Sequence, residues 1–275
     1  MTKSNLTVTP KSNELRTVKI YGGEVEISFN SGKHSYTVYD KKKHVNGLVP
    51  SVTQILRVLD KPALIGWCAK MGAEFIANKF VPGKVYRFTQ SEITALSEEV
   101  KNAHRAANKD ACDVGTMAHE WIAEFIVSRA HRKPTPRFPT DIRAKRCCQA
   151  AVKWIKSVNL QPMDVESIVY SRKFGYLGMT DVLGLVKVKG RPTIIDWKSS
   201  KGIYAEYHLQ LAAYKNAVEE MTGKRGLDRL IIKLGKEDGT FQPFPLPDED
   251  YAADLGAFLG LMPAQSRLRE LNVRP

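Results

Sequence analysis

The first part of the chain alternates hydrophobic and polar residues, which is the pattern of a strand buried on one face. Residues 18–30 and 34–40 show this alternation, and the Asn-Ser-Gly segment at 30–32 between them is rich in turn formers. We therefore predict a β-hairpin near the start of the chain. The polar residues 1–16 before it are expected to form a flexible N-terminus.

A capping box marks the start of a short helix after this hairpin. The side chain of Ser51 can accept a hydrogen bond from the backbone amide of Gln54, while the Gln54 side chain can accept one from the backbone amide of Ser51. The helix is expected to run to about Leu59. Hairpin and helix together are predicted to form an N-terminal segment over residues 17–60.

Helical spacing of apolar residues dominates the region that follows. It predicts helices between residues 62 and 131, with breaks at Pro82-Gly83 and near Asp110, and a further helix over residues 140–158. We assign residues 61–158 to a helical lobe.

Strand patterns return after Pro162, and the order of elements predicts a β-β-β-α-β core over residues 159–275. Three strands come first, and a helix that ends at Gly223, two more strands and a last helix follow. The expected ranges are 163–171, 177–189, 193–199, 205–222, 227–235, 241–244 and 248–267. The fold class is therefore α/β (α+β), with a helical lobe inserted before the core.

The balance of charges points to an anionic partner. Forty-two Lys and Arg residues against twenty-nine Asp and Glu give a formal charge of +13, which attracts polyanions. Nucleic acid is the leading partner, although ribosomal or anionic-membrane contact would give the same balance. No apolar run reaches the roughly 20 residues that span a bilayer, and the N-terminus has no hydrophobic signal core. We expect no membrane partner and a cytoplasmic location.

The four cysteines, Cys68, Cys112, Cys147 and Cys148, lie in segments that are predicted to be helical, and none has CxxC spacing. A disulfide framework is not expected in a cytosolic chain of this length. The adjacent cysteines at 147–148 are compatible with a switch based on metal binding or redox chemistry, and also with two buried, inert thiols. We interpret all four as structural.

A carboxylate and a lysine lie two residues apart on one predicted strand, so both side chains leave the same face. These are Asp196 and Lys198, and Asp181 on the preceding strand is the natural second carboxylate. Hydrolysis of a phosphodiester needs charge neutralisation and an activated water, which metal ions held by carboxylates supply. Asp196 and the backbone carbonyl of Trp197 would bind metal, Lys198 would orient or deprotonate water or stabilise charge, and Gly178 would leave room for a phosphate.

The register between the two strands decides whether the carboxylates meet. Asp181 opposes Asp196 directly only if the turn is centred near residues 188–189, whereas the Gly-Arg-Pro segment at 190–192 indicates a later centre. A bulge near Gly184 would correct the offset. The competing interpretation is an exposed strand that carries a surface Asp and a surface Lys.

These residues, together with Glu166 and the helical motif at 208–214, resemble the RecB-type branch of the PD-(D/E)XK nuclease superfamily. The likeness rests on the glycine-led Asp at 178–181, the D-x-K strand end at 194–199 and the order of the motifs, and it covers roughly residues 114–235. It implies a restriction-endonuclease-like mixed β-sheet flanked by helices. It also implies cleavage of DNA with one or two Mg2+ or Mn2+ ions.

The helical part of this motif is Gln210 followed by Tyr214, with Tyr207 on the same helix face. The resemblance implies that these residues, with Ser199 after the D-x-K strand, contact DNA and steady the site. A plain amphipathic helix with Gln and Tyr at its margin is the alternative, and both interpretations are compatible.

A histidine upstream completes the set of metal ligands that the resemblance implies. His119 lies in a Gly-Thr-x-x-His-Glu segment that is similar to the histidine motif of RecB-type enzymes, although a histidine on an apolar helix is often a core residue. The implied metal ligands are His119, Asp181, Asp196 and the Trp197 carbonyl. Glu166, on the adjoining strand, is a further catalytic candidate.

The N-terminal segments 34–40 and 49–56 are similar to those of phage exonucleases and the mitochondrial genome maintenance exonuclease. This likeness implies action on single-stranded DNA ends, in a phage or bacterial host, beside replication or recombination proteins. The CRISPR-adaptation nucleases share the core, but their four-cysteine ligand set is missing here, so no iron-sulfur cluster is expected.

Basic and aromatic residues are candidates for further DNA contacts, either as a phosphate track and stacking surfaces or as solvated faces and core. Helices between residues 62 and 131 would form an arch that admits a free single-stranded end. The candidates are Lys41, Lys42, Lys43, His44, Arg143, Lys145, Arg146, Lys153, Trp67, Tyr86, Phe88 and Trp121.

Three functions remain open from the sequence. The first is a metal-dependent exonuclease that degrades single-stranded DNA. The second is an endonuclease, either structure-selective or restriction-like, and the restriction-like form is disfavoured because no separate specificity domain is evident. The third is a catalytically inactive DNA-binding or assembly protein on the same fold, which intact Asp181, Asp196 and Lys198 argue against.

Overall fold

A computed structural model describes residues 15–30, 35–185 and 190–272 of the chain. It is a mixed α/β structure that divides into two compact units. The core unit comprises the residues up to Val58 and those from Ala118 onward, and the hairpin unit comprises Leu59–Met117. The polar N-terminal residues 1–14, which we expect to be flexible, lie outside the described residues.

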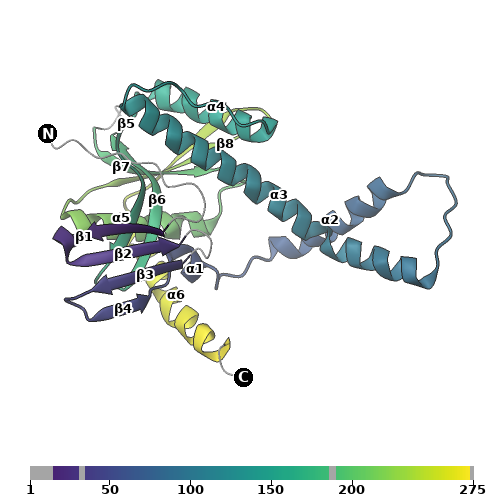
Figure 1. Ribbon diagram of the computed structural model, residues 1–275, viewed down its shortest axis with the longest axis horizontal. Coiled ribbons are helices and arrows are strands. Elements are labelled where there is room, and N and C mark those ends of the chain that lie inside the picture. Colours follow the sequence, from purple (N-terminus) through teal and green to yellow (C-terminus); the bar gives the residue numbers. More distant parts are fainter. Residues whose placement is uncertain (1–14, 31–34, 186–189, 273–275) are drawn as a thin grey trace. The chain divides into compact units, whose positions relative to one another are not determined.

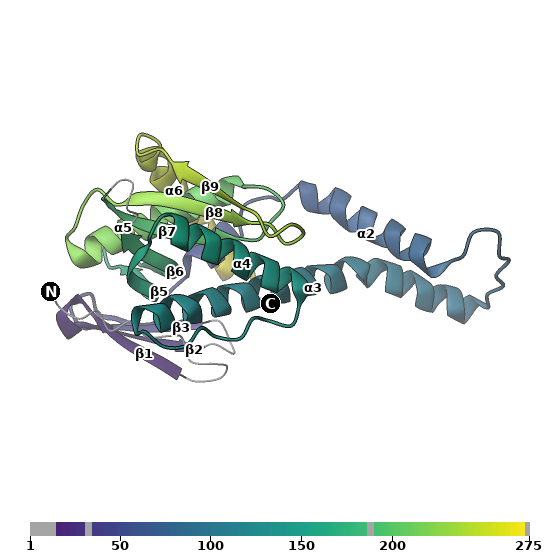
Figure 2. The ribbon, with the colours of Figure 1, turned by 90° about the horizontal axis from the view of Figure 1, so that it is seen from above.

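The core unit is built on a five-stranded mixed sheet, as predicted (Figures 1 and 2). Its third and fourth strands are parallel and are connected by helix α5 (Ala205–Thr222), while all other neighbours are antiparallel. Helix α5 ends at Gly223, whose φ of 69° is the left-handed cap that the sequence predicts. In sheet order the strands are β5 (Gln161–Ser171), β6 (Tyr176–Leu185), β7 (Pro192–Lys198), β8 (Asp228–Leu234) and β9 (Phe241–Leu246).

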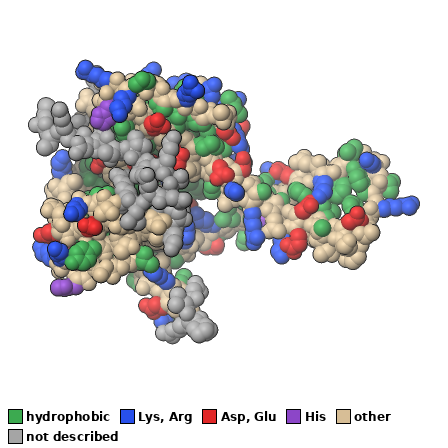
Figure 3. All heavy atoms as spheres, in the orientation of Figure 1, with side chains coloured by type: hydrophobic (Ala, Val, Ile, Leu, Met, Phe, Trp, Pro, Cys, Tyr) green, Lys and Arg blue, Asp and Glu red, His purple; other side chains and the backbone are tan. Residues whose placement is uncertain are grey.

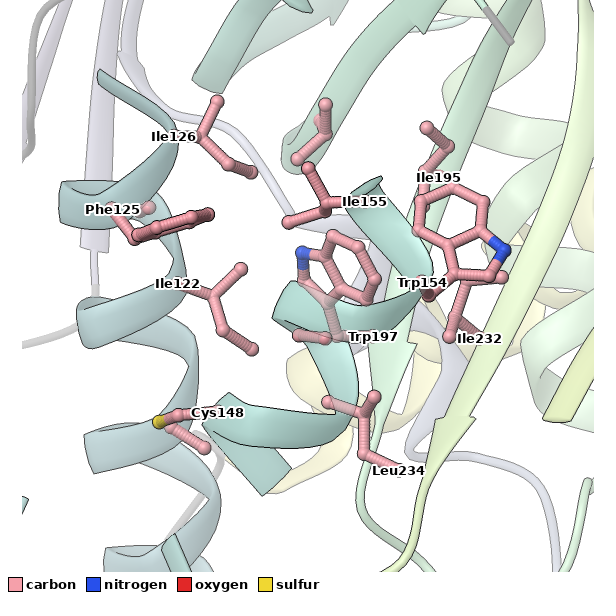
Figure 4. Close-up of a cluster of buried hydrophobic side chains, with 14 of the residues drawn as sticks. Ile122, Phe125, Ile126, Cys148, Trp154, Ile155, Ile195, Trp197, Ile232 and Leu234 are labelled. Atoms are coloured by element: carbon pink, nitrogen blue, oxygen red, sulfur yellow. The ribbon is translucent and has the colours of Figure 1, made fainter. Parts of the chain in front are cut away.

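Two helices cover one face of this sheet. The C-terminal part of α3 (Gln90–Ala130) and helix α4 (Ile142–Ser157) pack on it through a buried cluster of hydrophobic side chains (Figure 4). At its centre the rings of Trp154 and Trp197 meet edge to face, with centroids 5.4 Å apart. Because Ile195 and Trp197 of β7 point into this cluster, the alternation of the strand directs Asp196 and Lys198 to the opposite face, where α5 lies.

The buried cysteine pair belongs to the same cluster. Cys147 and Cys148 lie on α4, and burial raises the pKa of their thiols to about 11 and about 12, so both stay protonated and inert. Cys68 is half-buried and Cys112 is exposed, so the structural interpretation is wrong for Cys112. Within the described ranges, no helix combines the length and apolar character needed to cross a bilayer.

The N-terminal part forms an antiparallel four-stranded sheet rather than the predicted hairpin. The first predicted strand is divided at Tyr21–Gly23, where all three residues have positive φ and turn the chain back on itself. The inner face of this sheet packs against β5 and β6 through Ile168, Tyr170 and Leu177. The strands are β1 (Leu15–Ile20), β2 (Val25–Asn30), β3 (Ser35–Asp40) and β4 (Val45–Leu48).

Two further helices lie on the α5 side of the core unit. Helix α1 (Val52–Leu56) begins with the predicted capping box. The Ser51 hydroxyl accepts a hydrogen bond from the backbone amide of Gln54, and the Gln54 side chain accepts one from the backbone amide of Ser51. The helix ends three residues before the expected end. Helix α6 (Tyr251–Asn272) closes the described chain, and α1, α5 and α6 pack against one another.

The hairpin unit consists of helix α2 (Ala63–Lys79) and the N-terminal part of α3. The break at Pro82-Gly83 is confirmed, but the break expected near Asp110 is wrong, because α3 continues unbroken from Gln90 to Ala130. The residues around this position, 101–114, contain neither Gly nor Pro, and each Asp there costs a helix only about 0.7 kcal/mol or less. Lys79 of α2 forms an ion pair with Glu99 of α3.

The surface of the hairpin unit carries exposed hydrophobic side chains among its charges (Figure 3). Val81 and Val85 in the connection between α2 and α3 are 63% and 86% exposed. The rings of Tyr86 and Phe88 lie nearly parallel, with centroids 6.3 Å apart, and both pack edge to face on Phe80.

A largely buried guanidinium joins the N-terminal sheet to the five-stranded sheet. Arg172 donates two hydrogen bonds to Asp40, of 2.7 and 3.0 Å, and one of 2.7 Å to Glu24. Burial opposes the charge on Asp40, but the Arg172 bonds outweigh it and hold the pKa of this carboxyl below its ordinary value. Arg172 also lies over the ring of Tyr21, whose hydroxyl donates to the Tyr170 carbonyl.

Replacing Arg172 by methionine should therefore destabilise the core unit, because the buried Asp40 loses its counter-charge. We expect Arg172→Met to lower the free energy of unfolding by about 3 to 5 kcal/mol in urea titrations. The control is Arg191→Met, which removes an exposed guanidinium 3.7 Å from Asp228 and should cost less than about 1 kcal/mol. Equal losses for the two variants would contradict this account of the junction.

Candidate active site

The register of β6 and β7 brings the two predicted carboxylates together. Val182 pairs with Ile195, so Asp181 and Asp196 are the next residues along the two strands. This pairing corresponds to a turn centred between residues 188 and 189, as direct opposition requires, and the turn itself lies outside the described residues. The ladder between β6 and β7 runs through Gly184 without a shift, so no bulge is needed there to align Asp181 with Asp196. The register shift near Gly184 lies in the ladder with β5, where Pro162 pairs with Gly184 and Asp164 pairs with Leu183.

Asp181 is held by groups from two elements. Its Oδ2 accepts a 2.9 Å hydrogen bond from the backbone amide of Trp197, and Nδ1 of His119 lies 3.4 Å from the same oxygen. Burial opposes the charge of Asp181, but His119 and Lys198 outweigh it and lower the pKa of this carboxyl. Burial likewise opposes protonation of His119, but Asp181 raises the pKa of the imidazole. The Trp197 amide was not predicted as a partner, since a backbone donor leaves no signal in the sequence.

Asp196 and Lys198 form a buried ion pair at the end of β7. Lys198 Nζ lies 2.7 Å from Asp196 Oδ2, yet the two atoms are not aligned for a hydrogen bond, and this oxygen has no other partner among the described residues. Burial and the nearby Asp181 raise the pKa of Asp196 above its ordinary value, despite the opposing charge of Lys198. Burial works against the charge of Lys198, but Asp196 and Asp181 raise its pKa.

Helix α5 fixes the position of Lys198. Its ammonium donates a 3.0 Å hydrogen bond to Oε1 of Gln210 and lies 4.5 Å from the centre of the Tyr207 ring. Gln210 in turn donates a 3.0 Å bond to the hydroxyl of Tyr214. The structure thus brings the helical motif to the D-x-K strand. Gln210 and Tyr214 are only 9% and 3% exposed, and their contacts with DNA stay a prediction.

Gly178 has a different role from the one expected. A Cβ built on this residue would lie 2.5 Å from Cε1 of Tyr214, so the space beside the backbone is filled by that ring and not left for a phosphate. Gly178 therefore allows α5 to approach β6 closely enough for Tyr214 to reach Gln210.

Glu166 lies next to these residues with an unusual backbone. Its φ is +48°, in the left-handed region that a glutamate within a strand rarely adopts. Glu166 lines a small pocket together with His119, Asp181 and Trp197. The cavity volume is about 10 Å³, which is close to the room that one water molecule needs.

The side chains of the cluster, which comprises this pocket together with Asp196 and Lys198, fit a hard divalent cation in kind. Carboxylate oxygens and an imidazole nitrogen are ligands of Mg2+ and Mn2+, and the buried Oδ2 of Asp196 lacks an aligned donor. Across residues 15–30, 35–185 and 190–272, however, no three His, Cys, Asp or Glu side chains are arranged around one point as a complete ligand set. The assignment of His119, Asp181, Asp196 and the Trp197 carbonyl as metal ligands stays a prediction.

Other candidates lie away from this cluster or within the core. Trp121 is 5% exposed, stacks on Phe125 and Phe138, and therefore belongs to the core. Ser199 follows β7 and is half-buried. The basic run 41–44 forms the exposed turn between β3 and β4. The basic residues of α4, namely Arg143, Lys145, Arg146 and Lys153, are half-buried or exposed.

Comparison with known protein families gives a match over most of the chain. The sequence model of the PD-(D/E)XK nuclease superfamily matches residues 85–267, a range that includes every residue of the cluster described above. No curated protein matches the chain significantly. A structure from Eubacterium rectale, of a protein provisionally called an exonuclease, has 18% identity and a TM-score of 0.33 over 69% of this chain and 72% of that chain. An alkaline exonuclease from Laribacter hongkongensis has 14% identity and a TM-score of 0.29 over 56% of this chain and 84% of that chain.

The close fit of Gly178 against Tyr214 can be measured by double-mutant analysis. We expect Gly178→Ala to lower the free energy of unfolding by about 1 to 3 kcal/mol, because the new methyl group displaces the ring. In a Tyr214→Ala background the same substitution should cost much less.

The matched control for this cycle is Gly256→Ala in α6. A Cβ there meets nothing within 4 Å, and alanine favours a helix over glycine by up to about 1 kcal/mol, so this variant should be neutral or more stable. If Gly178→Ala lowers the free energy of unfolding equally with and without the Tyr214 ring, then contact with this ring is not the reason that position 178 requires glycine.

Proposed function

The chain belongs to the PD-(D/E)XK nuclease superfamily, and on this premise we propose that it is a metal-dependent nuclease that hydrolyses phosphodiester bonds in DNA. The observation that carries the proposal is the convergence of Asp181, Asp196 and Lys198 at neighbouring positions of β6 and β7, beside His119. A retained fold without catalysis would not require these buried charges, since burial of charged groups is costly.

Each residue of the cluster has a role in this proposal. His119, Asp181 and Asp196, with Glu166 beside them, are the residues that would hold Mg2+ or Mn2+. When bound, the metal supplies charge that activates a water molecule and neutralises the phosphate. Both polar neighbours of Lys198 Nζ are acceptors, so the lysine acts as a donor that stabilises the developing negative charge.

Gln210 and Tyr207 keep this ammonium in place. Through its second bond to Tyr214, Gln210 is itself held by a buried hydroxyl. Pre-positioning of this kind matters because an error of about 1 Å in a catalytic group can reduce a rate about 100-fold.

We assign single-stranded DNA ends as the substrate and an exonuclease as the mode of action. The RecB-type order of the motifs supports this assignment, and so does the surface of the hairpin unit, where Tyr86 and Phe88 are 36% and 44% exposed. Exposed rings stack on unpaired bases without sequence preference. Lys84 lies over the Tyr86 ring, which adds a positive charge next to this surface. The corresponding biological setting is DNA replication or recombination in a phage or a bacterium.

The catalytic assignment is tested by Asp196→Asn and Lys198→Met. With Mg2+ or Mn2+ and end-labelled DNA, we expect each variant to cut at least about 1,000-fold more slowly, because each removes charge at the reacting phosphate. DNA binding measured in chelator should change less than about threefold.

The matched controls are Asp164→Asn and Lys156→Met, which alter an exposed carboxylate and an exposed lysine outside the cluster and should leave cutting unchanged. Cleavage that persists in excess chelator would contradict the metal mechanism. Unchanged cleavage by Asp196→Asn would reject the site.

The requirement for an end is tested with two substrates of the same sequence. We expect linear single-stranded DNA to be degraded while covalently closed circular single-stranded DNA stays intact, since only the linear form offers a free end. Gel analysis of the two forms over the same time course makes the comparison. Equal rates of digestion would show an endonuclease and overturn this part of the proposal.

A further inference from the structure

A second cavity in the core unit is lined by positive and amide side chains. It has a volume of about 320 Å³, and its lining residues lie on or next to β3, β4, α1 and α6, the elements labelled in Figure 1. Arg57, at the C-terminal end of α1, and Arg269, near the end of α6, line two of its walls. We call this cavity the α1–α6 groove.

The positive charges of the groove have no acidic partner among the described residues. Neither Arg57 nor Arg269 forms an ion pair with a carboxylate there, and the described residues that line the groove include no acidic side chain. Guanidinium groups bind phosphate with paired donors, so two of them facing one cavity favour an anionic ligand. Gln54 and Gln265 add amide groups to the same lining.

The floor of the groove is apolar, which makes a small free anion a poor match. Tyr36 and Val49 are almost fully buried there, and the Tyr36 ring stacks on Phe29 with centroids 4.6 Å apart. Leu48 at the edge is 59% exposed. A ligand that carries phosphates on one side and flat apolar groups on the other would use both kinds of surface, and single-stranded nucleic acid has this chemistry.

The groove is connected to the proposed catalytic cluster by short paths. Val49 precedes Pro50, whose carbonyl accepts a 3.2 Å hydrogen bond from the amide of Leu177 on β6. Leu177 is four residues from Asp181 along this strand, a distance of about 13 Å. Helices α1 and α6 both pack against α5, which carries Gln210.

We propose that the α1–α6 groove binds the backbone of the single-stranded DNA substrate next to the segment that is cut, with Arg57 and Arg269 on its phosphates. This inference rests on the proposed function and extends it by assigning a binding site for the uncut part of the strand. The groove raises affinity for strands long enough to reach it, and it does not take part in bond cleavage.

The test uses the full-length chain with Arg57→Ala, Arg269→Ala and the double variant. Binding of a fluorescent 20-nucleotide oligothymidine is measured in chelator at several salt concentrations. The double variant should bind about tenfold more weakly at 0.1 M salt. Its slope of log affinity against log salt should be shallower by about 1.4, because each phosphate contact of a single strand contributes about 0.7.

The matched control is Arg267→Ala, which removes an arginine of α6 that pairs with Glu270 and does not line the groove. Its affinity and salt slope should equal those of the wild type. Thermal unfolding of all variants should be unchanged, since Arg57 and Arg269 are exposed. In cleavage assays the double variant should show a higher KM for the 20-nucleotide strand with kcat within about twofold of wild type.

The outcomes separate this inference from the proposed function. Wild-type protein that cuts DNA while the double variant keeps its affinity and salt slope would overturn the groove and leave the nuclease proposal intact. Wild-type protein that does not cut, but loses affinity on removal of the two arginines, would support the groove and contradict the nuclease proposal. An equal loss of affinity for a 20-base-pair duplex would overturn the assignment to single strands.

Discussion

The pairing of β6 with β7 is the constraint on which both the core and the candidate active site depend. Along β7, Ile195 and Trp197 fill the cluster under α3 and α4, while Asp196 and Lys198 leave the other face. A slip of one residue would place two charges among tryptophans and expose the apolar side chains. Burial of Trp197 therefore fixes the register of β7, and this register also places Asp196 beside Asp181.

The cluster combines charged side chains, each of which would be unfavourable to bury alone. Each carboxylate has a positive partner, which is His119 for Asp181 and Lys198 for Asp196, and Gln210 holds the second partner in turn. Buried charges of this kind are tolerated only when they are paired and hydrogen-bonded. The arrangement is thus pre-organised before any substrate binds. The packing of the surrounding helices offsets the unfavourable free energy of burying these charges.

Much of this could be predicted from the sequence, because the signals are local. Strand alternation, the capping box at Ser51 and the Gly223 cap define most elements, and D-x-K spacing places Asp196 and Lys198 on one face. The turn at Tyr21–Gly23, β4 and the unbroken α3 were missed, since short strands and polar helix segments carry weak patterns. The role of Gly178 and the amide that binds Asp181 depend on contacts between distant segments, which spacing along the chain does not encode.

The contact between Gly178 and Tyr214 has a consequence for how sequences of this kind change over time. A lineage that acquires a side chain at position 178 must first, or at once, lose the large ring at position 214, because both cannot occupy one space. Loss of that ring leaves Gln210 without its hydroxyl partner. The two positions are therefore expected to covary among homologues, and intermediates that carry only one change are disfavoured by selection.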